Sequence, residues 1–131
     1  MSGKDAAGSL ATMNDPVPGI GVAELGTALR VGGVLIDVRE PDEYVQAHVG
    51  GARLVPLQNV PDVVGELPVD QPVYVICLSG GRSHHAASFL RGQGIDAVNV
   101  LGGTAAWLRA GLPYLSGSET GDIEPSEMDQ R

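Results

Sequence analysis

The sequence predicts a small α/β domain in which a parallel β-sheet carries helices on both faces. Two observations lead to this prediction. Short apolar runs rich in β-branched residues alternate with segments of helical pattern, and such runs are typical of strands that are covered on both faces. The 131 residues amount to one domain, and a hydrophobic content of 43% is enough to form a buried core.

The first half of the predicted domain places one strand between helices. Residues 22–30 have a helical pattern that stops at a pair of glycines, and residues 34–38 form the first apolar run. Residues 41–46 are predicted as a helix because acidic residues at its start favour a helix N-terminus. A short helix is predicted over residues 60–64.

The second half alternates strand and helix twice. Residues 73–76 and 97–100 are the remaining apolar runs, bounded by Gly, Pro or Asp, and are predicted strands. Residues 83–93 and 104–110 are the helices that follow them, and each stops at a glycine.

Composition divides the chain into three parts. Residues 18–116 form the predicted domain. Residues 1–17 are small, polar and interrupted by Gly and Pro, which predicts a flexible leader, and residues 117–131 are acidic without apolar periodicity, which predicts a flexible tail. No apolar stretch is long enough to span a bilayer, and we see no signal-peptide pattern, so a cytoplasmic location is the simplest expectation.

Charge and cysteine content narrow the range of functions. The formal net charge of −8 argues against a general binder of nucleic acids or membrane surfaces, which needs a basic face. The single cysteine, Cys77, excludes an internal disulfide and any Cys-rich zinc or iron–sulfur site. We therefore expect a reduced, reactive thiol and neither a metal nor a cofactor.

The candidate site follows the strand predicted at residues 73–76. Ligands bind at the carboxyl ends of strands in open α/β sheets, and a Gly-rich loop at a helix N-terminus can bind an anion through its N–H groups. The same donors favour the thiolate of Cys77, which is the nucleophilic form. The segment that supplies these features consists of Cys77, Leu78, Ser79, Gly80, Gly81, Arg82 and Ser83.

Two residues of this segment have more than one expected role. If the loop curls around the sulfur, Arg82 can face a bound anion or brace the loop. Ser83 can donate its hydroxyl to the site, or it can cap the following helix, which is the more ordinary role of a serine there.

Four motifs in this chain resemble those of the rhodanese-domain family of sulfurtransferases. The first is the loop at residues 77–82, which a cysteine opens and an arginine closes. The resemblance spans residues 18–116 and implies a sheet of about five parallel strands. The other motifs are DVREPDEY at residues 37–44, HVGGA at residues 48–52 followed by Val55-Pro56, and LGGTAAW at residues 101–107 followed by GLP at residues 111–113.

The resemblance implies a two-step sulfur transfer. Cys77 attacks the outer, sulfane sulfur of a donor such as thiosulfate or a persulfide and keeps it as a Cys77 persulfide. A thiophilic acceptor, such as cyanide, a thiol or a partner protein, then takes the sulfur. The loop N–H groups stabilise the persulfide charge. Many thiosulfate-using members carry Arg directly after the cysteine, so Leu78 disfavours thiosulfate as the physiological donor.

Three other functions compete with sulfur transfer. Phosphatases and arsenate reductases on this fold have one more residue between Cys and Arg than the four that separate Cys77 from Arg82. The presence of Cys77 argues against a non-catalytic binding or regulatory module, because such a module has no need of the cysteine. A peroxide sensor would require an intermolecular disulfide, because the chain has no second cysteine.

Other polar residues of the motifs are expected to be structural. Asp37 and Arg39 are expected to hydrogen-bond the active loop and the neighbouring backbone, and His48 is expected to be a satisfied histidine and not a base. Adjacent helical positions point in different directions, so His84 and His85 are expected on the surface, with at most one at the mouth of the site. Trp107 is expected in the core.

Overall fold

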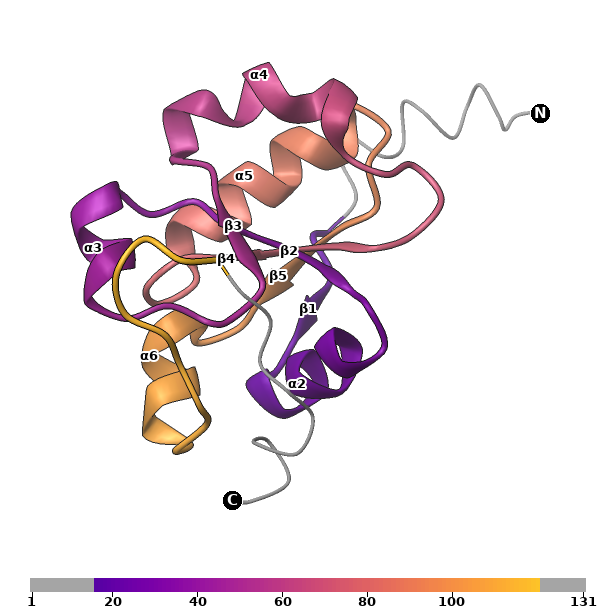
Figure 1. Ribbon diagram of the computed structural model, residues 1–131. Helices are drawn as coiled ribbons and strands as arrows, with labels where there is room; N and C mark the ends of the chain where they lie inside the picture. The colour runs from indigo at the N-terminus through magenta and orange to yellow at the C-terminus, as the bar shows by residue number, and fades with distance from the viewer. Residues whose placement is uncertain (1–15, 121–131) are drawn as a thin grey trace.

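The computed structural model describes residues 16–120, which form a sheet of five parallel strands between two layers of helices (Figure 1). This confirms the predicted parallel-sheet α/β fold. The strands lie in the order β1-β5-β4-β2-β3, so the three central ones are those predicted from apolar runs. The strands are β1 (Gly19–Ile20), β2 (Val34–Asp37), β3 (Ala52–Leu54), β4 (Val73–Ile76) and β5 (Ala97–Val100).

Helices cover both faces of this sheet. In Figure 1, α4 and α5 lie on one side of the strands, and α2 and α6 lie on the other. This arrangement confirms the prediction of helices on both faces. The helices are α2 (Val22–Arg30), α3 (Pro41–Gln46), α4 (Val60–Val63), α5 (Gly81–Gly92) and α6 (Gly103–Arg109), and the 3-10 turns η1 (Leu57–Asn59) and η2 (Val64–Glu66) flank α4.

Successive strand side chains point to opposite faces and so build two separate cores. Ile36 and Val75 face α5 and pack into one core, whereas Leu35 and Ile76 belong to the other. Trp107 of α6 is fully buried in the second core, as expected from the sequence. Both faces of the central strands are therefore covered, which explains why their sequences are continuous apolar runs.

The two strands absent from the predictions are the edge strands. β1 pairs with β5 alone and has two residues, and β3 pairs with β2 alone and has three. Because an edge strand is open to solvent on one side, β3 includes the exposed Arg53 and has no continuous apolar run. The apolar pattern that identifies the central strands is absent there.

Two helical segments differ from the predictions by more than one residue at an end. α5 begins at Gly81, two residues before the predicted start, because Gly80 adopts φ +116° and turns the chain directly into the helix. The helical segment around α4 extends through η1 and η2, well beyond the predicted residues 60–64. Pro61 lies in the first turn of α4, where a proline fits without loss of a hydrogen bond.

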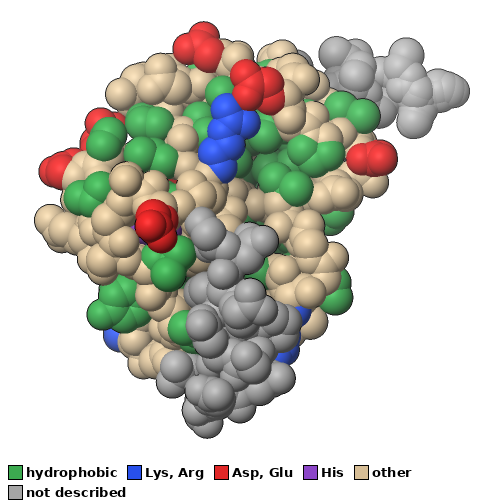
Figure 2. All heavy atoms as spheres, viewed as in Figure 1, with side chains coloured by type: hydrophobic (Ala, Val, Ile, Leu, Met, Phe, Trp, Pro, Cys, Tyr) green, Lys and Arg blue, Asp and Glu red, His purple; other side chains and the backbone are tan. Residues whose placement is uncertain are grey.

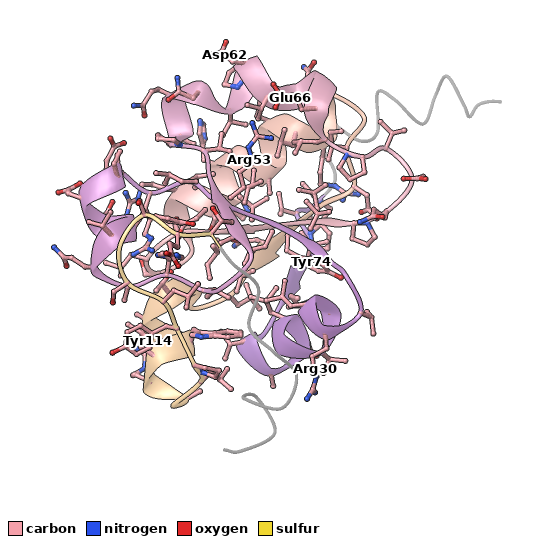
Figure 3. The ribbon with its side chains drawn as sticks, in the orientation of Figure 1. Arg30, Arg53, Asp62, Glu66, Tyr74 and Tyr114 are labelled. Atoms are coloured by element: carbon pink, nitrogen blue, oxygen red, sulfur yellow. The ribbon has the colours of Figure 1, made fainter. Side chains whose placement is uncertain are left out.

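A surface ion pair joins β3 to the helical layer. Arg53 points toward Glu66 in Figure 3, and Nη2 of Arg53 lies 2.6 Å from Oε1 of Glu66. Both side chains are about half exposed, so the pair contributes roughly 0–1 kcal/mol.

On the face drawn in Figure 2, basic side chains lie apart and form no continuous patch.

The ordered contacts of the domain continue past residue 116. The N–H of Gly117 donates to the Val45 carbonyl at 2.7 Å, and the Thr120 carbonyl accepts from the N–H of Gly51 at 2.7 Å. The first residues of the predicted tail are thus hydrogen-bonded to the domain, while residues 1–15 of the predicted leader and residues 121–131 of the tail lie outside the described residues.

Among the helices of residues 16–120, none has the length and apolar sequence that a membrane-spanning segment requires.

Candidate active site

The sulfur of Cys77 lies between the end of β4 and the N-terminus of α5. Cys77 directly follows β4, and Gly80 is the N-cap of α5 in a left-handed conformation. Because the helix begins at Gly81, Arg82 lies in its first turn and not in the loop before it, and Ser83 lies inside that turn and not at the start of the helix as predicted. Ser83 is therefore not the helix cap.

Donors surround the sulfur. The N–H of Gly80 lies 3.1 Å from Sγ, and the hydroxyl oxygen of Ser83 lies 3.3 Å from it. Burial raises the pKa of the Cys77 thiol, but the Ser83 hydroxyl and the N–H groups of Ser83, Gly80 and Ser79 bring this pKa below its ordinary value. The geometry therefore favours the thiolate, which is the nucleophilic form of a cysteine.

Asn99 of β5 holds this donor set in place. Its Oδ1 lies 2.6 Å from the Ser83 hydroxyl, and its Nδ2 donates to the Gly80 carbonyl at 3.2 Å. Asn99 is 4% exposed and Ser83 is fully buried, so the contacts are shielded from solvent. One side chain thus links the turn before α5 to the first turn of that helix.

Arg82 pairs with Glu43 of α3. Its two terminal nitrogens lie 2.8 and 2.9 Å from the two carboxylate oxygens of Glu43. The hydrogen bonds from Arg82 lower the pKa of Glu43 from 4.5 to about 2 despite partial burial, and Glu43 in turn raises the pKa of Arg82. Of the two roles expected for Arg82, this geometry supports bracing of the loop.

Asp37 and Arg39 form a buried pair at the end of β2. Nε and Nη2 of Arg39 donate to the Asp37 carboxylate at 3.0 and 2.8 Å, and Nη2 also donates to the Ala47 carbonyl at 2.8 Å. A weaker bond of 3.4 Å reaches the Glu43 carbonyl. The pair was expected to bond both the active loop and the neighbouring backbone. It bonds the backbone at Glu43 and Ala47, and it is linked to the loop only indirectly, through Glu43 and Arg82.

The first turn of α6 supports the back of the loop. The N–H and the hydroxyl of Thr104 donate to the Cys77 carbonyl at 2.9 and 3.0 Å, and the N–H of Ala105 donates to the Leu78 carbonyl at 3.0 Å. Gly103 makes this approach possible, because a Cβ there would lie 2.6 Å from the Cys77 carbonyl oxygen. The backbone beside the sulfur is therefore held from behind.

Two shallow pockets lie at the surface, one beside the loop and one along α5. One of about 180 Å³ opens beside Leu78, which is 45% exposed, and the other of about 260 Å³ lies along α5 and is mainly apolar. The first is lined by Arg39, Glu43, Gln46, Ala47, Leu78, Thr104 and Leu108. The second is lined by Leu57, Gln58, Val60, Pro61, His85, Ala86 and Phe89.

The histidines lie apart from the sulfur. His48 is fully buried, and its ring nitrogens contact the carbonyl groups of Tyr44 and Glu119, which fits the satisfied structural histidine expected. His84 and His85 are exposed on α5, and His85 lines the apolar pocket. Within residues 16–120, no group of three or more His, Cys, Asp or Glu side chains is placed to hold a metal ion.

Sequence reasoning missed Glu43, Asn99 and Thr104 as parts of this site. Glu43 was used only as a helix-start residue, and nothing local pairs it with Arg82, which is 39 positions away. Asn99 did carry a signal, because it is a polar residue inside an otherwise apolar strand run. A buried amide needs partners, and this need could have pointed to the neighbouring loop.

Comparisons with known proteins agree on one family. The family described as Rhodanese-like domain matches residues 22–110. The chain is 38% identical over 84 residues to a protein named Sulfurtransferase from Allochromatium vinosum, covering 63% of this chain and 78% of that protein. It is 37% identical over 83 residues to Thiosulfate sulfurtransferase GlpE from Pseudomonas putida, covering 63% and 74%.

The fold has close counterparts among solved structures. A rhodanese-related protein from Thermoplasma volcanium superposes with a TM-score of 0.70 at 30% identity. The match covers 75% of this chain and 97% of that one. Both the sequence and the architecture thus place the chain in the same group.

Proposed function

The chain belongs to the family of rhodanese-like domains, and on this premise we propose that it is a sulfurtransferase that carries sulfane sulfur as a persulfide on Cys77. The observation that carries the proposal is the position of the Cys77 sulfur, 3.1 Å from the N–H of Gly80 and 3.3 Å from the Ser83 hydroxyl at the start of α5. These donors suit the anionic sulfur of the thiolate that attacks the sulfur donor.

The reaction has two displacement steps. In the first, the Cys77 thiolate attacks the outer sulfur of the donor, a sulfur–sulfur bond forms to Sγ, and the bond between that outer sulfur and the rest of the donor breaks. The electron pair leaves with the remainder, which is sulfite from thiosulfate or a thiolate from a persulfide. In the second, a thiophilic acceptor attacks the terminal sulfur, and the Cys77 thiolate leaves.

The charges around the loop bear on the choice of donor. Arg82 is paired with Glu43, Arg39 is paired with Asp37, and the residue after the cysteine is the apolar, half-exposed Leu78. The cations nearest the site are thus neutralised by carboxylates. We propose that a persulfide or another donor of low charge is preferred over the doubly charged thiosulfate, with a thiol or a sulfur-accepting protein as the second substrate.

The same geometry favours sulfur transfer over phosphate or arsenate chemistry. An enzyme for a tetrahedral oxyanion uses the arginine of its loop to bind the oxygens. Here both terminal nitrogens of Arg82 are engaged by Glu43 at 2.8 and 2.9 Å. With only four residues between Cys77 and Arg82, the loop fits a single sulfur atom better than a tetrahedral group.

The test is an intact-mass measurement after incubation with sulfur donors. The reduced protein is mixed with thiosulfate, with a mercaptopyruvate-type donor and with a glutathione persulfide, and Cys77→Ser is treated in parallel. We expect the wild type to gain one sulfur atom and to lose it on addition of cyanide or a thiol, while Cys77→Ser gains none. Since Cys77 is the only cysteine of the chain, the gain is assigned without further mapping.

Two outcomes would contradict the proposal. No gain with any donor would refute sulfur transfer and leave the binding module as the better hypothesis. An equal gain by Cys77→Ser would show that the sulfur is held elsewhere.

A further inference from the structure

The hydroxyl of Ser83 has one hydrogen but two acceptors, Oδ1 of Asn99 at 2.6 Å and Sγ of Cys77 at 3.3 Å. We propose that Asn99 is a positioning residue that holds the Ser83 hydrogen while Cys77 is a thiol or a persulfide and yields it to the sulfur only in the thiolate. Its role during turnover rests on the function proposed above, but the competition itself does not require a sulfur donor.

The orientation of the Asn99 amide makes the competition unavoidable. Its Nδ2 donates to the Gly80 carbonyl at 3.2 Å, so its Oδ1 is the atom that faces Ser83. A flipped amide would set two oxygens against each other at Gly80. Because Asn99 is 4% exposed and Ser83 is fully buried, bulk water does not readily replace either partner.

In the thiol state the three groups form a complete chain. When the Ser83 hydroxyl donates to Asn99 at 2.6 Å, its oxygen, 3.3 Å from Sγ, is the acceptor that we infer for the Cys77 S–H, so each hydrogen has an acceptor. When the thiol loses its proton, the Ser83 hydrogen turns to the sulfur and Oδ1 of Asn99 loses its donor. A buried acceptor without a donor is unfavourable, so the loss of this hydrogen bond makes the thiolate less stable than it would be without Asn99.

In the persulfide the balance reverses. The negative charge lies on the terminal sulfur, and Sγ becomes a neutral divalent sulfur, which is a weak acceptor. The Ser83 hydrogen then returns to Asn99, and the partner lost in the thiolate is regained. Asn99 therefore favours the persulfide relative to the thiolate and keeps the attacking thiolate more nucleophilic.

The charged groups around the sulfur lie on α5, on α3 and at the end of β2. Arg82 of α5 is paired with Glu43 of α3, and Asp37 of β2 is paired with Arg39. His84 and His85 of α5 are exposed. Substitution of Asn99 alters none of these side chains, so a change in the titration of Cys77 has two possible paths, the Ser83 hydroxyl and the Gly80 backbone that Asn99 also contacts.

The first test is the pH profile of Cys77 alkylation by iodoacetamide, which reports on the only cysteine of the chain. In Asn99→Ala the Ser83 hydroxyl can donate to the thiolate without losing another acceptor. The midpoint of the alkylation pH profile is therefore expected at lower pH than in the wild type. Below the midpoint alkylation becomes faster, by roughly threefold to tenfold, and above it slower, because a better-stabilised thiolate is less nucleophilic. An unchanged or higher midpoint overturns the proposal.

A double-mutant cycle identifies the path of the effect. Ser83→Ala is expected to move the midpoint to higher pH, and adding Asn99→Ala in that background is expected to change nothing further. An equal shift by Asn99→Ala with and without Ser83 would overturn the proposal, since it would place the effect in the Gly80 carbonyl and the backbone of the turn.

A second measurement leaves Asn99 in place and so does not depend on the folding of its variants. In the wild type, the side-chain carbonyl carbon of Asn99 is expected to titrate in NMR spectra at the same midpoint as Cβ of Cys77, and this titration is expected to vanish in Ser83→Ala. An Asn99 signal that does not change at the titration midpoint of Cys77 overturns the proposal. Neither experiment uses a sulfur donor, so its failure is distinguishable from a failure of sulfur transfer.

Discussion

Two loop-to-helix connections follow the carboxyl ends of neighbouring parallel strands, and their helix N-termini have different hydrogen-bond partners. Both the β4–α5 and the β5–α6 connections turn through a left-handed glycine, Gly80 with φ +116° and Gly102 with φ +78°. In the second connection, the N–H groups of Thr104 and Ala105 donate to backbone carbonyls of the first. In the first, the donors face the sulfur of Cys77.

The difference shows what makes a helix N-terminus a site. The first N–H groups of any helix lack partners within it, and a neighbouring carbonyl or a ligand can take them. The start of α6 is a closed end, because the carbonyls of Cys77 and Leu78 accept from its N–H groups. The start of α5 is an open end, because the N–H groups there face the sulfur of Cys77 and not a backbone carbonyl. The closed end supports the backbone of the open one, so the two can be separated by mutation.

The largest effect is expected from a methyl group at the closed end. In Gly103→Ala the new Cβ would lie 2.5 to 2.6 Å from the carbonyls of Leu78 and Cys77, at a residue with φ +60°. Because both obstacles are backbone atoms, we expect a loss of about 2–4 kcal/mol in the free energy of unfolding, measured by urea denaturation.

Gly81→Ala, in the first turn of α5, is the matched control. A Cβ there meets nothing within 4 Å, so stability should be unchanged or rise by up to about 1 kcal/mol. Similar losses at both glycines would contradict the division into a closed and an open end.

A second effect is expected from acid, because a side-chain ion pair holds the open end. Pairing with Arg82 lowers the pKa of Glu43 from 4.5 to about 2. Since the pKa is lower in the folded state, the stability that this carboxylate contributes is present above about pH 4.5 and is lost as the pH falls toward 2. In Arg82→Met, NMR should show Glu43 titrating near its ordinary value.

Arg53→Met removes an arginine from the exposed pair with Glu66 and serves as the control. It should leave the titration of Glu43 unchanged. A Glu43 titration that stays near 2 in Arg82→Met would mean that Arg82 does not brace the open end.

The smallest effect is expected at Leu78, whose carbonyl serves the closed end while its side chain lines the pocket beside the open one. Leu78→Arg should raise kcat/KM for thiosulfate by roughly threefold to tenfold, and the gain should shrink with added salt. Leu78→Met keeps an apolar side chain and should change little. An equal gain with an uncharged donor would show that the added charge is not the cause.

Local pattern predicted the parts of the molecule that depend on neighbours along the chain. The central strands were found because burial on both faces demands continuous apolar runs, and the edge strands β1 and β3 were missed because they face no such demand. The start of α5 was placed two residues late, at Ser83, because a local pattern assigns the pair of glycines before Arg82 to a loop.

The sequence by itself determined the α/β class, the parallel central strands and the candidate nucleophile, because apolar periodicity and a cysteine between a strand and a helix are local features. Only the tertiary structure decided the partners of that cysteine. Arg82 meets Glu43 across 39 positions and Ser83 meets Asn99 across 16. The strand order makes this possible, because β4 lies between β5, which carries Asn99, and β2, which α3 follows. Such pairings depend on which strands are neighbours in the sheet, and no local pattern encodes that order.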